Sequence, residues 1–120
     1  MRPAAALLSL LLSLPAAAAT PDAAARAEID HLLAYLEQPA CEFFRNGRWH
    51  PSSEARVHID KKYQYLLKKG WVRTTEEFIE RAATRSSTSG KPYQVRCAGS
   101  PPVPSAHGLN EELRRYRTAR

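Results

Sequence analysis

The stretch CEFFRNGRWH, residues 41–50, decides the fold that this sequence predicts. Asn46-Gly47 lies between two flanks rich in aromatic residues. This dipeptide is typical of a two-residue type I′ turn, whose two central positions both need positive φ. Such a turn fixes the register of the two strands, because positions 45 and 48, 44 and 49, and 43 and 50 then face each other. We therefore expect an antiparallel hairpin here.

Two of the expected cross-strand pairs have opposite effects. Phe44 opposite Trp49 stabilises the hairpin, as aromatic pairs across strands do. Arg45 opposite Arg48 destabilises it, since like charges that face each other repel. Solvent, a carboxylate or a bound anion must offset this repulsion.

Helical periodicity flanks the hairpin on both sides. Apolar residues recur at helical spacing in residues 21–38, and Pro21 suits the start of that helix. Residues 52–69 follow the hairpin and predict a second helix with a serine cap and an acid in its first turn. Residues 75–84 predict a third helix, preceded by Thr74 in a capping-box pattern.

A further strand is predicted late in the chain. Residues 92–97 alternate between apolar and polar side chains, which favours a strand that shares a face with the hairpin. Cys41 and Cys97, the two cysteines of the chain, then lie on neighbouring strands. In an exported protein a single disulfide between them is expected, and closing so long a loop contributes about 4 kcal/mol.

The remaining C-terminal residues predict a linker and a helix. Residues 99–105, GSPPVPS, are typical of a linker, and Leu109, Leu113 and Tyr116 indicate a final helix with a basic end. The expected fold class is α+β, with three or four helices packed on a small antiparallel sheet made of the hairpin and one more strand.

The N-terminus has the pattern of a secretory signal peptide. Arg2 precedes an apolar run at residues 4–14, and small residues up to Ala19 offer a cleavage site. The run is too short for the roughly 20 residues of a membrane helix. We expect residues 1–19 to be removed and residues 20–120 to form a single periplasmic domain. Removing Arg2 leaves 17 Lys plus Arg against 12 Asp plus Glu, a net charge of +5.

The serine-rich stretch SSTSGKPY, residues 86–93, is a second candidate binding feature. A Walker loop would need glycine at position 85 and a hydroxyl residue at position 92, where this chain has Arg85 and Pro92. Backbone amides, serine hydroxyls and nearby cations could still hold an anion. The alternative is a polar turn whose hydroxyls satisfy local backbone groups.

Other chemistries have weaker support. Glu54, His58 and Ser87 could be arranged as a hydrolase triad, although nothing resembles a nucleophile elbow. The histidines and cysteines lack the spacing of a metal site, so we expect no metal and no cofactor. Export argues against nucleic acid as a partner.

Several segments together resemble the YfeK-like family of small exported bacterial proteins of unknown function. They are C-x-F-x-R-N-G at 41–47, A-x-x-H-I-x-x-K-Y at 55–63, T-T-E-E-F-I at 74–79 and A-T-x-S-S-x-S-G-K-P-Y at 83–93. The resemblance implies a periplasmic single domain and supplies no substrate. It suggests a family pattern at Arg45, Asn46, Gly47, His58, Lys62, Ser86, Ser87, Ser89, Gly90 and Tyr93.

We expect a non-enzymatic binding module for a partner protein or an anionic envelope component. The alternative is a small serine-type hydrolase that uses Ser87 and His58. The serine-rich stretch should fold back toward the Asn46-Gly47 turn or the edge of the second helix. The candidate ligand-binding residues are Arg45, Asn46, Arg48, His58, Lys62, Ser86, Ser87, Ser89, Lys91 and Tyr93.

Overall fold

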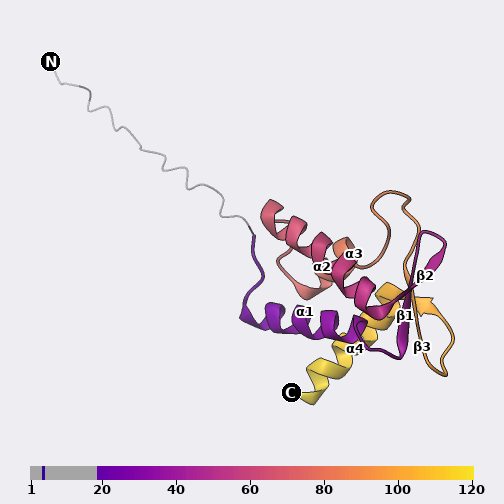
Figure 1. Cartoon of the computed structure of the whole chain (residues 1–120). Helices are drawn as coiled ribbons and strands as arrows, with labels where there is room; N and C mark the ends of the chain where they lie inside the picture. Colours follow the sequence, from indigo (N-terminus) through magenta and orange to yellow (C-terminus); the bar gives the residue numbers. More distant parts are fainter. Residues whose placement is uncertain (1–3, 5–18) are drawn as a thin grey trace.

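The computed structural model describes residues 19–120 together with Ala4, and it has an α+β fold. Four helices pack beside one antiparallel sheet (Figure 1). The expected fold class is thereby confirmed. The elements in chain order are α1 (Ala23–Leu36), β1 (Cys41–Arg45), β2 (Arg48–Pro51), α2 (Ser52–Lys69), α3 (Thr75–Ala82), β3 (Gln94–Cys97), β4 (Val103–Pro104) and α4 (Ser105–Ala119).

The hairpin has the predicted register. β1 and β2 are antiparallel, and Arg45 pairs with Arg48 while Phe44 pairs with Trp49. The two aromatic rings are 5.2 Å apart between centroids. Asn46 has φ of 51° and Gly47 has φ of 80°, so both central residues adopt the positive φ that a type I′ turn requires.

The sheet is larger than the sequence predicts. Its strand order is β2-β1-β3-β4, with every neighbouring pair antiparallel. Strand β4 lies inside residues 99–105, which were expected to be a linker, and Val103 pairs there with Val95. A two-residue strand that follows Pro102 and ends in Pro104 has no alternation that a sequence pattern could detect. β3 begins at Gln94 rather than at position 92.

The predicted disulfide is present. Cys41 and Cys97 are register partners on β1 and β3, and their Cα atoms lie 4.0 Å apart. The bond joins positions separated by 56 residues. It therefore closes the chain segment that contains the hairpin, α2 and α3.

Helix boundaries correct three details of the expectation. α1 begins at Ala23, and the Asp22 carboxylate caps it by accepting from the Ala25 amide, so Pro21 precedes the helix. The serine cap of α2 is wrong, because β2 runs directly into the helix and Pro51 takes the cap position. α3 ends at Ala82, two residues earlier than expected.

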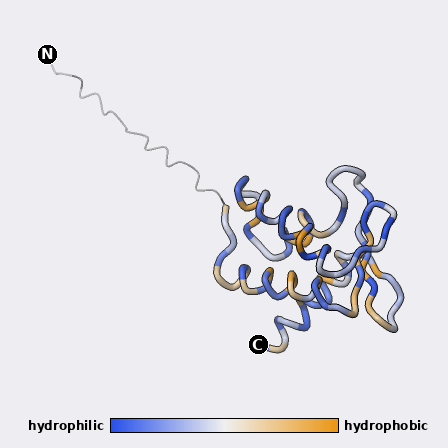
Figure 2. Tube along the Cα trace, viewed as in Figure 1, coloured by the Kyte–Doolittle hydropathy of each residue, from blue (hydrophilic) through white to orange (hydrophobic). Residues whose placement is uncertain are grey.

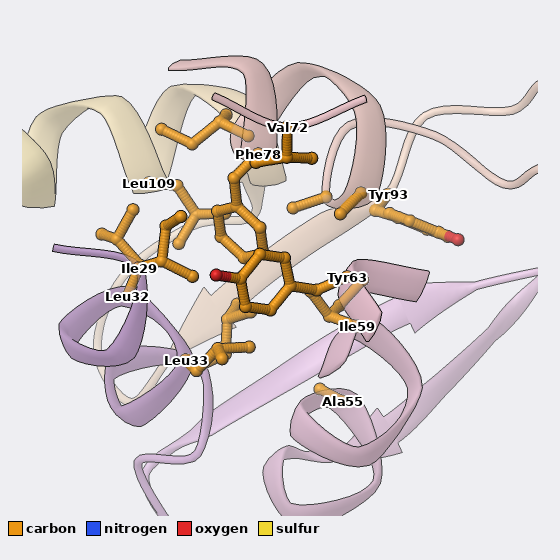
Figure 3. Close-up of a cluster of buried hydrophobic side chains, with 14 of the residues drawn as sticks. Ile29, Leu32, Leu33, Ala55, Ile59, Tyr63, Val72, Phe78, Tyr93 and Leu109 are labelled. Atoms are coloured by element: carbon orange, nitrogen blue, oxygen red, sulfur yellow. The ribbon is translucent and has the colours of Figure 1, made fainter. Parts of the chain in front are cut away.

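The core lies between the helices and one face of the sheet. Tyr63 and Phe78 meet edge to face at its centre, with ring centroids 5.2 Å apart (Figure 3). Tyr93 also packs into the core, but its hydroxyl points away from the centre of the cluster. Figure 2 shows hydrophilic residues along the hairpin tip and much of α2, where the candidate site lies.

No helix within the described residues has the length and apolar character needed to cross a membrane. The predicted signal peptide falls almost entirely outside the described residues, so export stays a prediction.

Candidate functional site

Tyr93 connects the core to a polar pocket at the surface. Its side chain is only 1% exposed, and its ring packs against Phe43 with centroids 4.8 Å apart. Its hydroxyl lies 3.0 Å from Lys62 Nζ and 3.0 Å from His58 Nε2. The buried ring thus holds the phenol oxygen between two side chains that project from adjacent turns of α2.

The directions of these hydrogen bonds follow from the donor capacity of each group. The Lys62 ammonium is only a donor, so the Tyr93 oxygen accepts from it, and the phenol proton can in turn be donated to Nε2 when neutral His58 carries its proton on Nδ1. Lys62 donates a second hydrogen bond to the carbonyl of Arg85, 2.8 Å away, and keeps a third N–H for another acceptor.

Burial and neighbouring positive charge shift the ionisation of this cluster. Burial is the main cause that lowers the pKa of His58 to about 4, and the charges of Arg45 and Lys62 lower it further. Burial, followed by the charge of Arg85, lowers the pKa of Lys62 to about 8. Burial also raises the pKa of the Tyr93 phenol. Lys62 is therefore mostly charged at neutral pH, while His58 and Tyr93 are neutral.

The serine-rich stretch forms a closed turn. The Ser86 amide donates to the Lys91 carbonyl at 2.9 Å, and the Gly90 amide donates to the Ser86 carbonyl at 3.0 Å. The buried Ser86 hydroxyl accepts from the amides of Thr88 and Ser89, each at 3.3 Å. Ser86 thus stabilises the turn itself, which agrees with the alternative of hydroxyls that satisfy backbone groups.

This turn folds back onto the hairpin tip. Ser89 Oγ donates to Asn46 Oδ1 at 3.4 Å, and both segments lie on the same side of the molecule (Figure 1). A pocket of about 280 Å³, the turn pocket, lies between the hairpin, α2 and the serine-rich turn. It is lined by Arg45, Asn46, His58, Lys62, Ser86, Ser87, Thr88 and Tyr93.

The turn pocket is positively charged. Arg45 and Lys62 contribute two cations, and none of the described residues that line the pocket is acidic. Within the described part of the chain, no side-chain hydrogen bond or ion pair engages the Arg45 guanidinium. Arg45 is therefore available to an anion that enters the pocket.

The structure brings together seven of the ten residues that the sequence singled out for binding, and adds one. Thr88, which was not singled out, also lines the turn pocket. Its only signal in the sequence is membership of the hydroxyl-rich run. The three candidates outside the lining are Arg48, Ser89 and Lys91.

Two of the three side chains considered for a hydrolase triad, Glu54 and His58, have other partners. Glu54 Oε2 lies 3.0 Å from His50 Nδ1, and His58 Nε2 faces the Tyr93 hydroxyl. Among the described side-chain hydrogen bonds, none joins Ser87 to His58. These contacts lend no support to a Ser87 nucleophile activated by His58.

Residues 23–117 match a protein family described as a Family of unknown function (DUF5329). The chain belongs to this family. Uncharacterized protein YfeK of Salmonella typhimurium (strain LT2) is 38% identical to it over 89 residues, which are 73% of this chain and 72% of the relative. The resemblance to a YfeK-like family is thereby confirmed. No solved structure matches the chain. The DUF5329 match includes every residue that lines the turn pocket.

Proposed function

We propose that this protein is a binding module that holds an anionic group of an envelope component in the turn pocket. The observation that carries the proposal is the convergence of Arg45 and Lys62 on one concave site whose described lining residues include no carboxylate. Two cations that share a site repel each other, and a bound anion removes that cost. The same anion would offset the Arg45–Arg48 repulsion across the hairpin.

The donors of the turn pocket suit an oxyanion. Arg45 offers a guanidinium, which can form two parallel hydrogen bonds with two oxygens. Lys62 offers its remaining N–H, and the exposed hydroxyls of Ser87 and Thr88 can rotate to donate. The His58–Tyr93 hydrogen bond holds the back of the pocket in place.

The envelope location rests on the predicted signal peptide and agrees with the disulfide. Disulfides persist in oxidising compartments such as the periplasm. The hydrolase alternative has no comparable support, since Ser87 and His58 share the pocket without a described hydrogen bond.

Titration with inorganic phosphate tests the proposal. At pH 7 and low salt, amide NMR shifts should move in the hairpin tip and the serine-rich turn. Arg45→Ala should weaken phosphate about 10- to 100-fold, because a hydrogen bond to a charged group contributes about 1.5–3 kcal/mol. Arg48→Ala is the matched control: it removes the same charge from the other side of the turn but does not line the pocket.

Two further measurements separate specific binding from general attraction. Ser87→Ala should weaken phosphate by about 1 kcal/mol without lowering the melting temperature, since its hydroxyl is exposed. Added sodium chloride should compete. Equal losses in Arg45→Ala and Arg48→Ala would contradict a defined pocket. A drop in stability in Ser87→Ala, with binding unchanged, would make the serine-rich turn purely structural.

A further inference from the structure

A second hollow continues from the turn pocket along α2. This hollow, the helix groove, has a volume of about 350 Å³ and shares His58, Lys62 and Ser87 with the turn pocket. The shared side chains make the two hollows direct neighbours. The groove is lined by His58, Lys61, Lys62, Tyr65, Leu66, Arg81 and Ser87.

The helix groove combines an apolar wall with a basic rim. Five of its lining residues lie at positions 58, 61, 62, 65 and 66, which share one face of α2. Lysine stems, the Tyr65 ring and Leu66 supply apolar surface, while the Lys62 ammonium turns toward Tyr93 and the Arg85 carbonyl. Arg81, from the neighbouring α3, adds a third cation. None of the described residues that line the groove is acidic.

Exposed apolar side chains gather along the same edge of the molecule. Within the described residues, the large hydrophobic side chains that remain exposed are Val57 at 66%, Tyr65 at 55% and Trp71 at 47%. Tyr65 lines the groove and meets the Trp71 ring edge to face at 6.3 Å between centroids. Val57 lines an adjoining hollow together with His58, Lys61 and the acidic Glu54. Tyr65 and Trp71 thus form an exposed aromatic pair beside the groove, a surface that an apolar ligand can cover.

We infer that the ligand is an amphiphilic phosphate monoester, with its phosphate in the turn pocket and an apolar or planar body in the helix groove. This inference rests on the proposed function. A phosphate monoester carries close to two negative charges and three acceptor oxygens. The turn pocket offers two cations and the exposed hydroxyls of Ser87 and Thr88, a set of donors that the three oxygens of a phosphate can engage together.

A series of soluble phosphates tests this inference. Inorganic phosphate, butyl phosphate and phenyl phosphate are titrated into the mature protein by calorimetry, with butanol and phenol as uncharged controls. Phenyl phosphate should bind about tenfold more tightly than inorganic phosphate, because its ring leaves water for the groove. The uncharged controls should show no measurable binding.

Two variants locate the apolar body. Tyr65→Ala should abolish most of the gain from the phenyl ring while leaving inorganic phosphate unchanged. Gln64→Ala, an exposed neighbour on the same helix that lies outside the groove, should keep the full gain. Arg81→Ala should weaken phenyl phosphate severalfold, and Lys68→Ala is its charge-matched control on α2.

The outcomes are distinguishable. If inorganic phosphate binds through Arg45 and the phenyl or butyl body adds nothing, the inference is overturned and the proposed function stands. A gain that is equal in wild type and Tyr65→Ala also overturns the inference. Binding to vesicles of anionic phospholipid without binding to soluble phenyl phosphate would also overturn the inference, and would indicate a surface that binds membranes instead of a soluble ligand. If no phosphate compound binds in an Arg45-dependent way, both proposals fall.

Discussion

At His58, burial and neighbouring positive charge both lower the pKa of the imidazole. Its folded-state pKa of about 4 lies below the ordinary 6.5. The unfolded chain therefore binds the proton more tightly than the folded chain does. The stability that neutral His58 contributes is complete above pH 6.5 and is lost as the pH falls from 6.5 toward 4.

We expect NMR titration of the imidazole to find a pKa for His58 near 4 in the free protein. Arg45→Ala should raise the pKa of His58, because removing a nearby like charge favours the imidazolium. Sulfate, which keeps its charge across this range, should raise the pKa of His58 in the wild type and have little effect in Arg45→Ala. An unperturbed pKa in the wild type would contradict the buried, positively charged pocket.

Residue types in the sequence singled out seven of the residues that line the turn pocket, but they could not show which side chains pair with each other. Glu54 lies four residues from both His50 and His58, and helical spacing alone permits either pairing. The structure selects His50, because β2 runs without a loop into α2 and His58 turns toward Tyr93. That choice depends on where the strand ends, which a local pattern locates only within a few residues.

At the scale of elements, the stability of the hairpin depends on the positive φ of Gly47 in its turn. A Cβ added at Gly47 would meet no atom within 4 Å, so space is not the constraint. The constraint is φ of 80°, which a β-branched residue adopts only at a cost. Gly47→Val should lower the free energy of unfolding by about 1–2 kcal/mol.

Urea denaturation measures this loss. Gly47→Asn is the matched control, since asparagine tolerates positive φ and should cost distinctly less than valine. If valine and asparagine cost the same, the turn does not hold its type I′ geometry in solution.

The elements that were predicted correctly are those with a strong local signal. The hairpin register follows from one turn dipeptide and a period of two, and α2 follows from eighteen residues of helical spacing. Strand β4 was missed because its two residues form a strand only by pairing with β3. The N-terminus of α2 was misjudged because a serine cap and a strand that leads into the helix look alike in sequence.

At the scale of the whole molecule, the Cys41–Cys97 disulfide joins β1 to β3 and closes a loop that contains the hairpin, α2 and α3. Mature protein prepared under oxidising conditions should contain no free thiol by alkylation and mass spectrometry. Replacing both cysteines with serine should cost about 4 kcal/mol, because the unfolded chain regains the freedom of a loop of 56 residues. Two alkylated cysteines in the wild-type protein would contradict the pairing.

Three helices meet at a buried ion pair that no local sequence pattern indicates. Glu28 on α1 is only 4% exposed, and its carboxylate accepts from Thr75 Oγ1 on α3 at 2.6 Å. Arg117 on α4 donates to both carboxylate oxygens, at 2.8 and 3.0 Å. Residues 28 and 117 are separated by 89 positions, so only the packing of α1 against α4 brings them together.

We expect protonation of Glu28 to lower the free energy of unfolding at acid pH. The hydrogen bonds from Arg117 are the main cause that lowers the pKa of Glu28 to about 2, from an ordinary 4.5, against the opposing effect of burial. The folded chain therefore holds the proton less tightly than the unfolded chain. The resulting stability, on the order of 3 kcal/mol, is present above pH 4.5 and is lost as the pH falls toward 2.

Glu28→Gln tests this expectation directly. The variant should be about 2–3 kcal/mol less stable than the wild type at pH 7, because it leaves a guanidinium without its buried partner. The difference should shrink as the pH falls from 4.5 toward 2, where the wild-type carboxylate is also neutralised. Glu76→Gln, whose side chain pairs with Arg117 but is 55% exposed, should cost less than about 1 kcal/mol. Urea denaturation between pH 2 and 7 measures both, and parallel pH profiles for wild type and Glu28→Gln would show that Glu28 does not hold the three helices together.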